Sequence, residues 1–135
     1  MKFLLDTNII IYAYRRQGGC IERIRARPAQ DIVLCSINVF ELEYGLAQSQ
    51  RPQVLQVFVR ELMERHTTLE FDTASARQAG RVRAHLRKLG TPIGDYDVQI
   101  AGIALAHNLT VVTHNTREFG RVPGLQVEDW YEADA

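Results

Sequence analysis

Short apolar runs alternate along the chain with longer segments whose apolar residues recur at helical spacing. The short runs are typical of buried strands, and we expect strands at 2–5, 31–35, 68–71, 109–113 and, as an edge strand, 125–130. The longer segments predict helices at 7–15, 20–27, 37–49, from Pro52 onward, from Asp72 or Thr73 to Gly90, and at 96–108. Strands that alternate with helices indicate an α/β domain, with a mainly parallel sheet of about four or five short strands flanked by helices.

Polar residues mark the expected helix ends. Ser36 is predicted to cap the helix that follows it, and Asp72 or Thr73 to cap the long helix before Gly90. The apolar stripe of this long helix is predicted to comprise Ala79, Val82, Leu86 and Leu89. The β-branched run in 7–15 is a poor helix signal.

Length and composition are those of a globular protein. The chain has 135 residues with 46% hydrophobic residues, and we expect residues 1–135 to form a single domain. No apolar run approaches the roughly 18 residues that a membrane span requires, and an acid at position 6 is not typical of a signal peptide. Cys20 and Cys35 have no metal-binding or redox spacing and fit reduced thiols in a cytoplasm.

The charge is balanced overall but unevenly distributed. The net charge is zero, while basic residues concentrate in 1–30 and 51–90 and acidic residues in 91–135. Of the 16 basic residues, 14 are arginine, which suits bidentate contacts with phosphate and also surface ion pairs. Composition alone favours an ordinary solvated surface.

Several carboxylates fall at expected strand ends or at the start of apolar helices. They are Asp6, Glu41 or Glu43, Asp95 and Asp97, and Asn115 follows the strand at 109–113. The carboxyl ends of parallel strands share one edge of a sheet, so these side chains can meet there. Oxygen ligands suit Mg²⁺ or Mn²⁺, and such an ion beside a phosphodiester promotes its hydrolysis. The pattern therefore outlines a metal-dependent nuclease.

Each of these residues also has a structural interpretation. Asp6 can cap a helix, Asp95 and Asp97 can be acids favoured at a helix start, and Asn115 can be a turn residue. Spacing alone does not distinguish Glu41 from Glu43, because their helix is apolar almost all round. The aromatic residues Tyr12, Tyr14 and Phe40 and the four histidines favour core or surface positions over base stacking or catalysis; the histidines are His66, His85, His107 and His114.

Four ordered blocks resemble the PIN-domain ribonucleases, and among them the VapC toxins of bacterial toxin–antitoxin pairs. The blocks are LLDTNIIIY, SINVFELEYG, GTPIGDYDVQIAGIAL and LTVVTHNTREFGRVPGLQVEDW, and the resemblance that they mark extends over essentially the whole chain. The last block especially resembles the subgroup that cleaves initiator tRNA in its anticodon region. Any one block is a weak signal, but four in the family's order are a strong one.

The resemblance implies a role for each matching residue. Asp6 and Asp97 match family acids that bind Mg²⁺, with Mn²⁺ as an alternative, and Glu41 rather than Glu43 matches the acid between them. Asn115 matches a fourth position where many PIN domains carry Asp, so a second metal ion would be held less tightly. Thr113 and Asp95 are candidates for the outer shell. Asp95 stands where relatives often have proline or a small residue, so it is alternatively a solvent-facing extra acid.

The resemblance also implies an activity and partners. The expected reaction is hydrolysis of RNA to 5′-phosphate and 3′-hydroxyl ends without a covalent intermediate, with Arg15, Arg77 and Arg81 as candidate contacts to the RNA backbone. The expected partners are a second copy of the chain and a VapB-type antitoxin, within a higher toxin–antitoxin assembly that contacts operator DNA through the antitoxin alone. The expected location is the bacterial cytoplasm.

Three other interpretations are weighed against this one. A phosphoacceptor receiver domain requires a lysine late in the chain, whereas the only lysines are Lys2 and Lys88. A PIN-like binding module without catalysis is weakened by the presence of Asp6, Glu41 and Asp97, although Asn115 leaves it open. A PIN nuclease that acts on another RNA, or on single-stranded DNA, is compatible with the sequence.

Overall fold

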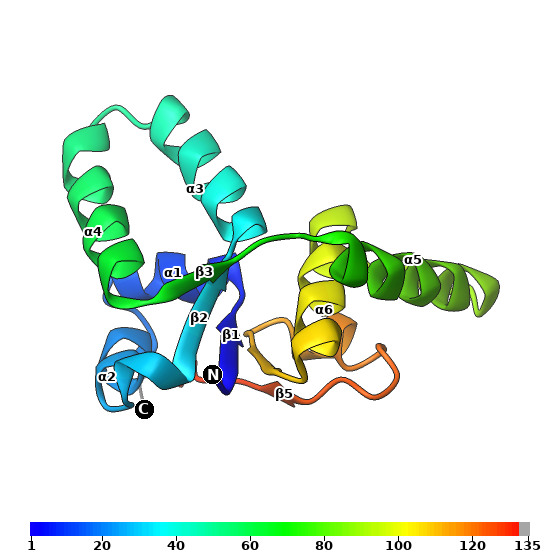
Figure 1. Cartoon of the computed structure of the whole chain (residues 1–135). Helices are drawn as coiled ribbons and strands as arrows, with labels where there is room; N and C mark the ends of the chain where they lie inside the picture. Colours follow the sequence, from blue (N-terminus) through cyan, green and yellow to red (C-terminus); the bar gives the residue numbers. More distant parts are fainter. Residues whose placement is uncertain (133–135) are drawn as a thin grey trace.

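The computed structural model describes residues 1–132, so the end of the predicted domain, at 133–135, lies outside the described residues (Figure 1). Five strands form one parallel sheet in the order β3-β2-β1-β4-β5. The strands are β1 (Phe3–Leu5), β2 (Ile32–Cys35), β3 (Thr67–Leu69), β4 (Thr110–Val112) and β5 (Val127–Glu128). The α/β prediction is confirmed, including the edge position of β5.

Helices cover both faces of this sheet (Figure 1). They are α1 (Thr7–Tyr14), α2 (Cys20–Arg25), α3 (Ser36–Gln48), α4 (Pro52–Arg65), α5 (Thr73–Lys88), α6 (Asp95–His107) and α7 (Thr116–Phe119), with a 3-10 turn at Ala29–Asp31. The short helix α7 was not predicted. None of the described helices is long and apolar enough to cross a lipid bilayer.

The two faces of the sheet carry separate cores, because alternate residues of a strand point to opposite sides. Leu4 packs with Val111 against α5 and α6, whereas Leu5 packs with Val112 against α1, α2 and α4. All four side chains are buried almost completely. The central strands β1 and β2 are therefore apolar at every position, as in a parallel sheet covered on both faces.

The predicted Ser36 cap and the predicted place of Leu89 in an apolar stripe are wrong, whereas the predicted Asp72 cap is confirmed. Ser36 does not cap α3: its hydroxyl accepts a 3.0 Å hydrogen bond from the Phe71 N–H, which turns the chain away after β3. The predicted strand at 68–71 accordingly ends at Leu69. Asp72 does cap α5, accepting a 2.9 Å hydrogen bond from the Ser75 N–H. Leu89 is 62% exposed because α5 ends one residue before it.

The strand order reverses between β1 and β4. From β1 the chain builds outward to β2 and β3 on one side, and β4 and β5 add on the other. Such a reversal opens a crevice at the carboxyl ends of the two central strands, which is where ligands bind in open α/β sheets.

Candidate active site

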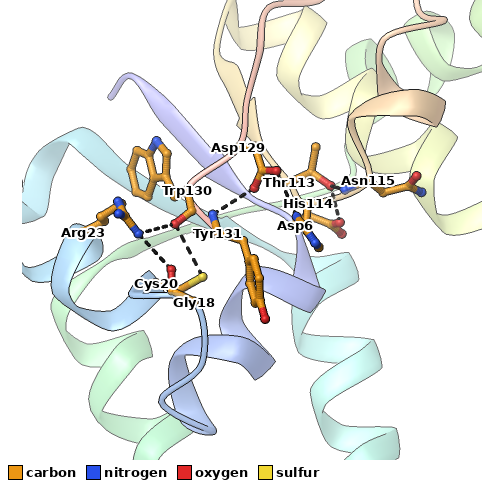
Figure 2. A network of polar contacts seen from close by, with 10 residues as sticks. All are labelled: Asp6, Gly18, Cys20, Arg23, Thr113, His114, Asn115, Asp129, Trp130 and Tyr131. Carbon is orange, nitrogen blue, oxygen red and sulfur yellow. Dashed lines mark hydrogen bonds and ion pairs between the residues drawn. The ribbon is translucent and has the colours of Figure 1, made fainter. Parts of the chain in front are cut away.

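Asp6 lies at this reversal point, directly after β1. Its N–H donates to the Val112 carbonyl oxygen, and its Oδ2 accepts a 2.8 Å hydrogen bond from the Thr113 hydroxyl (Figure 2). Asp6 is 4% exposed and occupies the N-cap position of α1, but its side chain makes no capping hydrogen bond there. The hydroxyl of Thr113, directly after β4, therefore holds the carboxylate in place.

Glu41 reaches the same edge of the sheet from α3. Its Oε1 accepts a 2.8 Å hydrogen bond from the Thr7 hydroxyl at the start of α1. The fully buried Asn38 supports this contact, because its Nδ2 donates to Thr7 Oγ1 at 2.9 Å and to the Leu5 carbonyl at 3.1 Å. Glu43 is exposed and lines a different groove, with α4. The geometry thus places Glu41, and not Glu43, beside Asp6.

Asp97 and Asn115 approach from the opposite side, on α6 and before α7, and both contact Glu118. Asn115 Nδ2 donates a 2.8 Å hydrogen bond to Glu118 Oε2, and its backbone N–H donates to Thr113 Oγ1 at 2.9 Å. Asp97 shares a side-chain hydrogen bond with Glu118. We name Asp6, Glu41, Asp97 and Glu118 the acid cluster. Sequence reasoning missed Glu118, although it lies three residues after Asn115, a spacing that a helical turn makes adjacent.

The electrostatics show that these acids repel one another. Burial raises the pKa of Asp6 to about 6, and the charge of Glu41 adds to this effect against the opposing Thr113 hydrogen bond. Burial also raises the pKa of Asp97 to about 7, followed by the charge of Asp6 and by the hydrogen bond and charge of Glu118. The cluster therefore gathers more negative charge than its surroundings neutralise.

The donor set fits a hard divalent cation. Carboxylate oxygens with unneutralised charge are the ligands that Mg²⁺ and Mn²⁺ select. Within residues 1–132 no three His, Cys, Asp or Glu side chains already converge as a formed metal-binding set. The acids are held instead by Thr113, Thr7 and one another. A bound cation would thus relieve the repulsion between these carboxylates, which lie close together but are hydrogen-bonded to different partners.

Four other predicted residues lie apart from the acid cluster. Asp95 is exposed and pairs with Arg83 at 3.5 Å, beside a separate pocket formed with α5. Arg15 ends α1, at the end opposite to Asp6. Arg77 and Arg81 lie exposed on α5.

The C-terminal segment contacts His114, the residue that follows Thr113 (Figure 2). Asp129 contacts His114 Nδ1 through Oδ2 at 2.9 Å and accepts the Tyr131 N–H through Oδ1 at 2.9 Å. Arg23 donates to the carbonyl oxygens of Trp130 and Gly18, both at 2.8 Å. These contacts join residues 129–131 to α2 and to the loop before it. They also hold His114, which follows β4.

The predicted aromatic core positions are only partly correct. Tyr12 is half-buried against His114 and Tyr131, and Tyr14 packs on Phe58. Phe40 is 55% exposed, so its predicted core position is wrong. The reason is the position of α3, whose buried side is already taken by Ile37, Asn38 and Leu42.

Comparison with known proteins agrees with this geometry. The PIN domain family matches residues 3–125. The tRNA(fMet)-specific endonuclease VapC of Shigella flexneri is 38% identical and that of Salmonella typhimurium 40% identical, each over 96% of this chain and 98% of the relative. The crystal structure of VapBC2 from Rickettsia felis bound to a DNA fragment from their promoter superposes with a TM-score of 0.87 at 32% identity, covering 96% of this chain and 99% of that one. The chain belongs to the PIN-domain family and, within it, to the VapC ribonucleases.

Proposed function

We propose that this chain is the toxin of a VapBC-type toxin–antitoxin pair and hydrolyses RNA with the help of Mg²⁺, for which Mn²⁺ can substitute. The observation that carries the proposal is the acid cluster at the carboxyl ends of β1 and β4, where burial and mutual repulsion raise the pKa values of Asp6 and Asp97. Buried like charges are unfavourable unless a cation or a reaction makes use of them. PIN-domain ribonucleases generally depend on a divalent metal ion, which fits this donor set.

The position of each candidate active-site residue supports a different role in the reaction. Asp6 and Asp97 would hold the ion, which supplies positive charge for the phosphate oxygens and lowers the pKa of water. Glu41, oriented by Thr7, would accept the proton of the attacking water. Attack of this water on phosphorus would break the bond to the 3′ oxygen, which would take up a proton from solvent, and would leave a 5′-phosphate and a 3′-hydroxyl. Asn115 would contribute a neutral oxygen from the far side, and its contact with Glu118 restrains it there.

We infer the substrate and the partners from the relatives of this chain. Two relatives are named tRNA(fMet)-specific endonucleases, and we propose initiator tRNA, cut in its anticodon stem-loop, as the substrate here. A VapB-type antitoxin would bind the toxin, which we place in the bacterial cytoplasm as a homodimer within a larger assembly. The DNA in the Rickettsia felis complex supports operator binding, which we assign to the antitoxin alone. Arg15, Arg77 and Arg81 remain candidates for contacts with the RNA backbone.

The test is cleavage of a mixed tRNA pool by antitoxin-free protein, in Mg²⁺ and in EDTA. A single cut in initiator tRNA should disappear in EDTA and in the Asp6→Asn and Asp97→Asn variants. The chain offers two matched controls, because Asp95→Asn and Glu43→Gln remove equivalent charges outside the acid cluster and should leave cleavage unchanged. Glu41→Gln should lose it.

Other outcomes separate the alternatives. A metal-dependent cut in a different RNA would keep the mechanism and discard the substrate. Binding of RNA without cleavage by the folded wild type would favour the non-catalytic binding module. Cleavage that survives both Asp6→Asn and Asp97→Asn would show that the acid cluster is not the active site.

A further inference from the structure

A groove of about 480 Å³ opens beside the acid cluster and is lined by aromatic rings. Its lining residues are Phe40, Glu41, Tyr44 and Tyr96. The three rings are 55%, 60% and 45% exposed, respectively. Large exposed apolar side chains that gather in one place mark binding surfaces more often than isolated ones do.

Two of the aromatic residues are sequence neighbours of two residues of the acid cluster. Phe40 directly precedes Glu41 on α3, and Tyr96 directly precedes Asp97 on α6. The ring centroids of Phe40 and Tyr96 lie 5.3 Å apart at an interplanar angle of 47°. Both side chains nevertheless stay about half exposed and line the groove. Each helix therefore presents one acid to the site and one aromatic ring beside it.

We propose that this aromatic groove binds an unpaired nucleobase of the RNA, next to the phosphate that is cleaved, by stacking on Phe40 and Tyr96. The inference rests on the proposed ribonuclease function, because that function places the scissile phosphate at Glu41 and Asp97. The base of the adjoining nucleotide must then lie within one nucleotide's reach of these acids. Single-stranded RNA is recognised chiefly through unstacked bases that pack on aromatic side chains.

The dimensions and chemistry of the groove favour a base over a protein partner. Its volume accommodates one or two bases, and its wall includes the acid that would serve the reaction. Stacking is tolerant of base identity, because every base has a π face. The groove would therefore select unpaired over paired nucleotides without choosing a sequence. That selection would direct the cut to a loop or another unpaired region.

The test combines ring variants with a missing base. Wild type, Phe40→Leu, Tyr96→Leu and Phe40→Trp are compared on a short RNA whose cut site has been mapped, and on the same RNA with an abasic nucleotide beside that site. Leucine keeps the apolar bulk and removes the ring, whereas tryptophan keeps a ring. Leu89→Ala is the control, because Leu89 is also a large exposed apolar residue but lies directly after α5, outside the groove.

The expected result is an effect that depends on the base. Each leucine variant should raise KM on the intact RNA on the order of tenfold, with little change in kcat. The Phe40→Trp variant should have a KM close to that of wild type. The abasic RNA should bring wild type to the level of the variants and leave the variants unchanged. An equal loss on both RNAs, or no loss on either, would overturn the proposal. A loss of self-association in the leucine variants without any dependence on the base would also overturn it, assigning the surface to a protein interface.

A second readout needs no cleavage and separates this inference from the proposed function. An RNA with 2-aminopurine beside the cut site is titrated into Asp6→Asn and into the double variants that add Phe40→Leu or Tyr96→Leu. Stacking should quench the fluorescence in the single variant and not in the doubles. Quenching without any cleavage by wild type would contradict the ribonuclease function and support the groove. Cleavage by wild type without ring-dependent quenching would support the ribonuclease function and contradict the proposed base-binding groove.

Discussion

The hydroxyl of Thr113 donates a 2.8 Å hydrogen bond to Oδ2 of Asp6, across a sequence separation of 107 residues. The same hydroxyl oxygen accepts the Asn115 N–H at 2.9 Å. One fully buried side chain thus joins the carboxyl ends of β1 and β4 and positions two of the candidate active-site residues. Asp6 is thereby presented with a fixed orientation.

Replacing this hydroxyl should affect both the pH profile and the stability. In Thr113→Val, Asp6 loses a hydrogen bond that favours its charged form, so its pKa should rise further. We expect kcat/KM at pH 7 to fall by about tenfold or more, with the acidic limb of the pH–rate profile moved to higher pH. The unpaired Asn115 N–H should lower the free energy of unfolding by about 1–3 kcal/mol. Thr113→Ser keeps the hydroxyl and is the control, and an unchanged acidic limb in Thr113→Val would contradict the assignment.

The raised pKa values predict that the metal-free protein loses stability as pH rises. The folded state retains protons on Asp6 up to a pKa of about 6 and on Asp97 up to about 7, whereas both carboxyls ionise near 3.8 when unfolded. Between these values the folded state binds more protons, so the free energy of unfolding decreases with pH. For Asp6 alone the loss amounts to about 2–3 kcal/mol between pH 4 and pH 8.

Thermal unfolding in EDTA at a series of pH values measures this loss. Tm should fall by several degrees between pH 5 and pH 8, and Mg²⁺ should restore most of it at pH 8, because a cation that binds the ionised acids stabilises the folded state. The Asp95→Asn variant should follow the wild-type curve. A Tm that is constant or rises over this range in EDTA would show that the acids do not repel one another.

The fold was largely predictable because its central strands consist mostly of buried apolar residues. β1, β2 and β4 lie within one residue of their predicted bounds, since burial on both faces selects apolar residues at nearly all of their positions. Errors occurred where tertiary contacts override local pattern. Ser36 has the sequence of a helix cap, but its hydroxyl accepts a hydrogen bond from Phe71, which lies beside it only in the folded chain.

The site was predictable in its residue types and less so in its contacts. Strand-end acids identified Asp6, and the family resemblance distinguished Glu41 from Glu43, which spacing alone could not do. Glu118 escaped because α7 has only four residues, too few for a periodic signal. The exposure of Phe40 was also not predictable, because the sequence does not show which side of the apolar helix α3 remains uncovered.

Removing the charge of Asp6 should stabilise the protein while abolishing its activity. The Asp6→Asn variant eliminates a buried carboxylate that burial and Glu41 both destabilise in its charged form. At pH 8 in EDTA we expect the free energy of unfolding to rise by about 1–3 kcal/mol, measured by urea denaturation. The Asp95→Asn control removes an exposed charge and should stay within about 0.5 kcal/mol of wild type. A destabilised Asp6→Asn would mean that the carboxylate is well neutralised in the metal-free fold.

Thr7 should be required for the rate of the reaction rather than for substrate binding. Its hydroxyl donates to Glu41 Oε1 and accepts from the buried Asn38, so Thr7→Val deprives Glu41 of its donor and leaves an Asn38 N–H without its acceptor. We expect kcat to fall on the order of tenfold or more while KM stays within about twofold, because a freely rotating Glu41 is less often placed to accept the proton of water. Thr7→Ser should restore both parameters, and thermal unfolding confirms that each variant is folded at the assay temperature. Equal kcat values for Thr7→Val and wild type would show that Glu41 does not depend on this contact, and a change confined to KM would assign Thr7 to RNA binding instead.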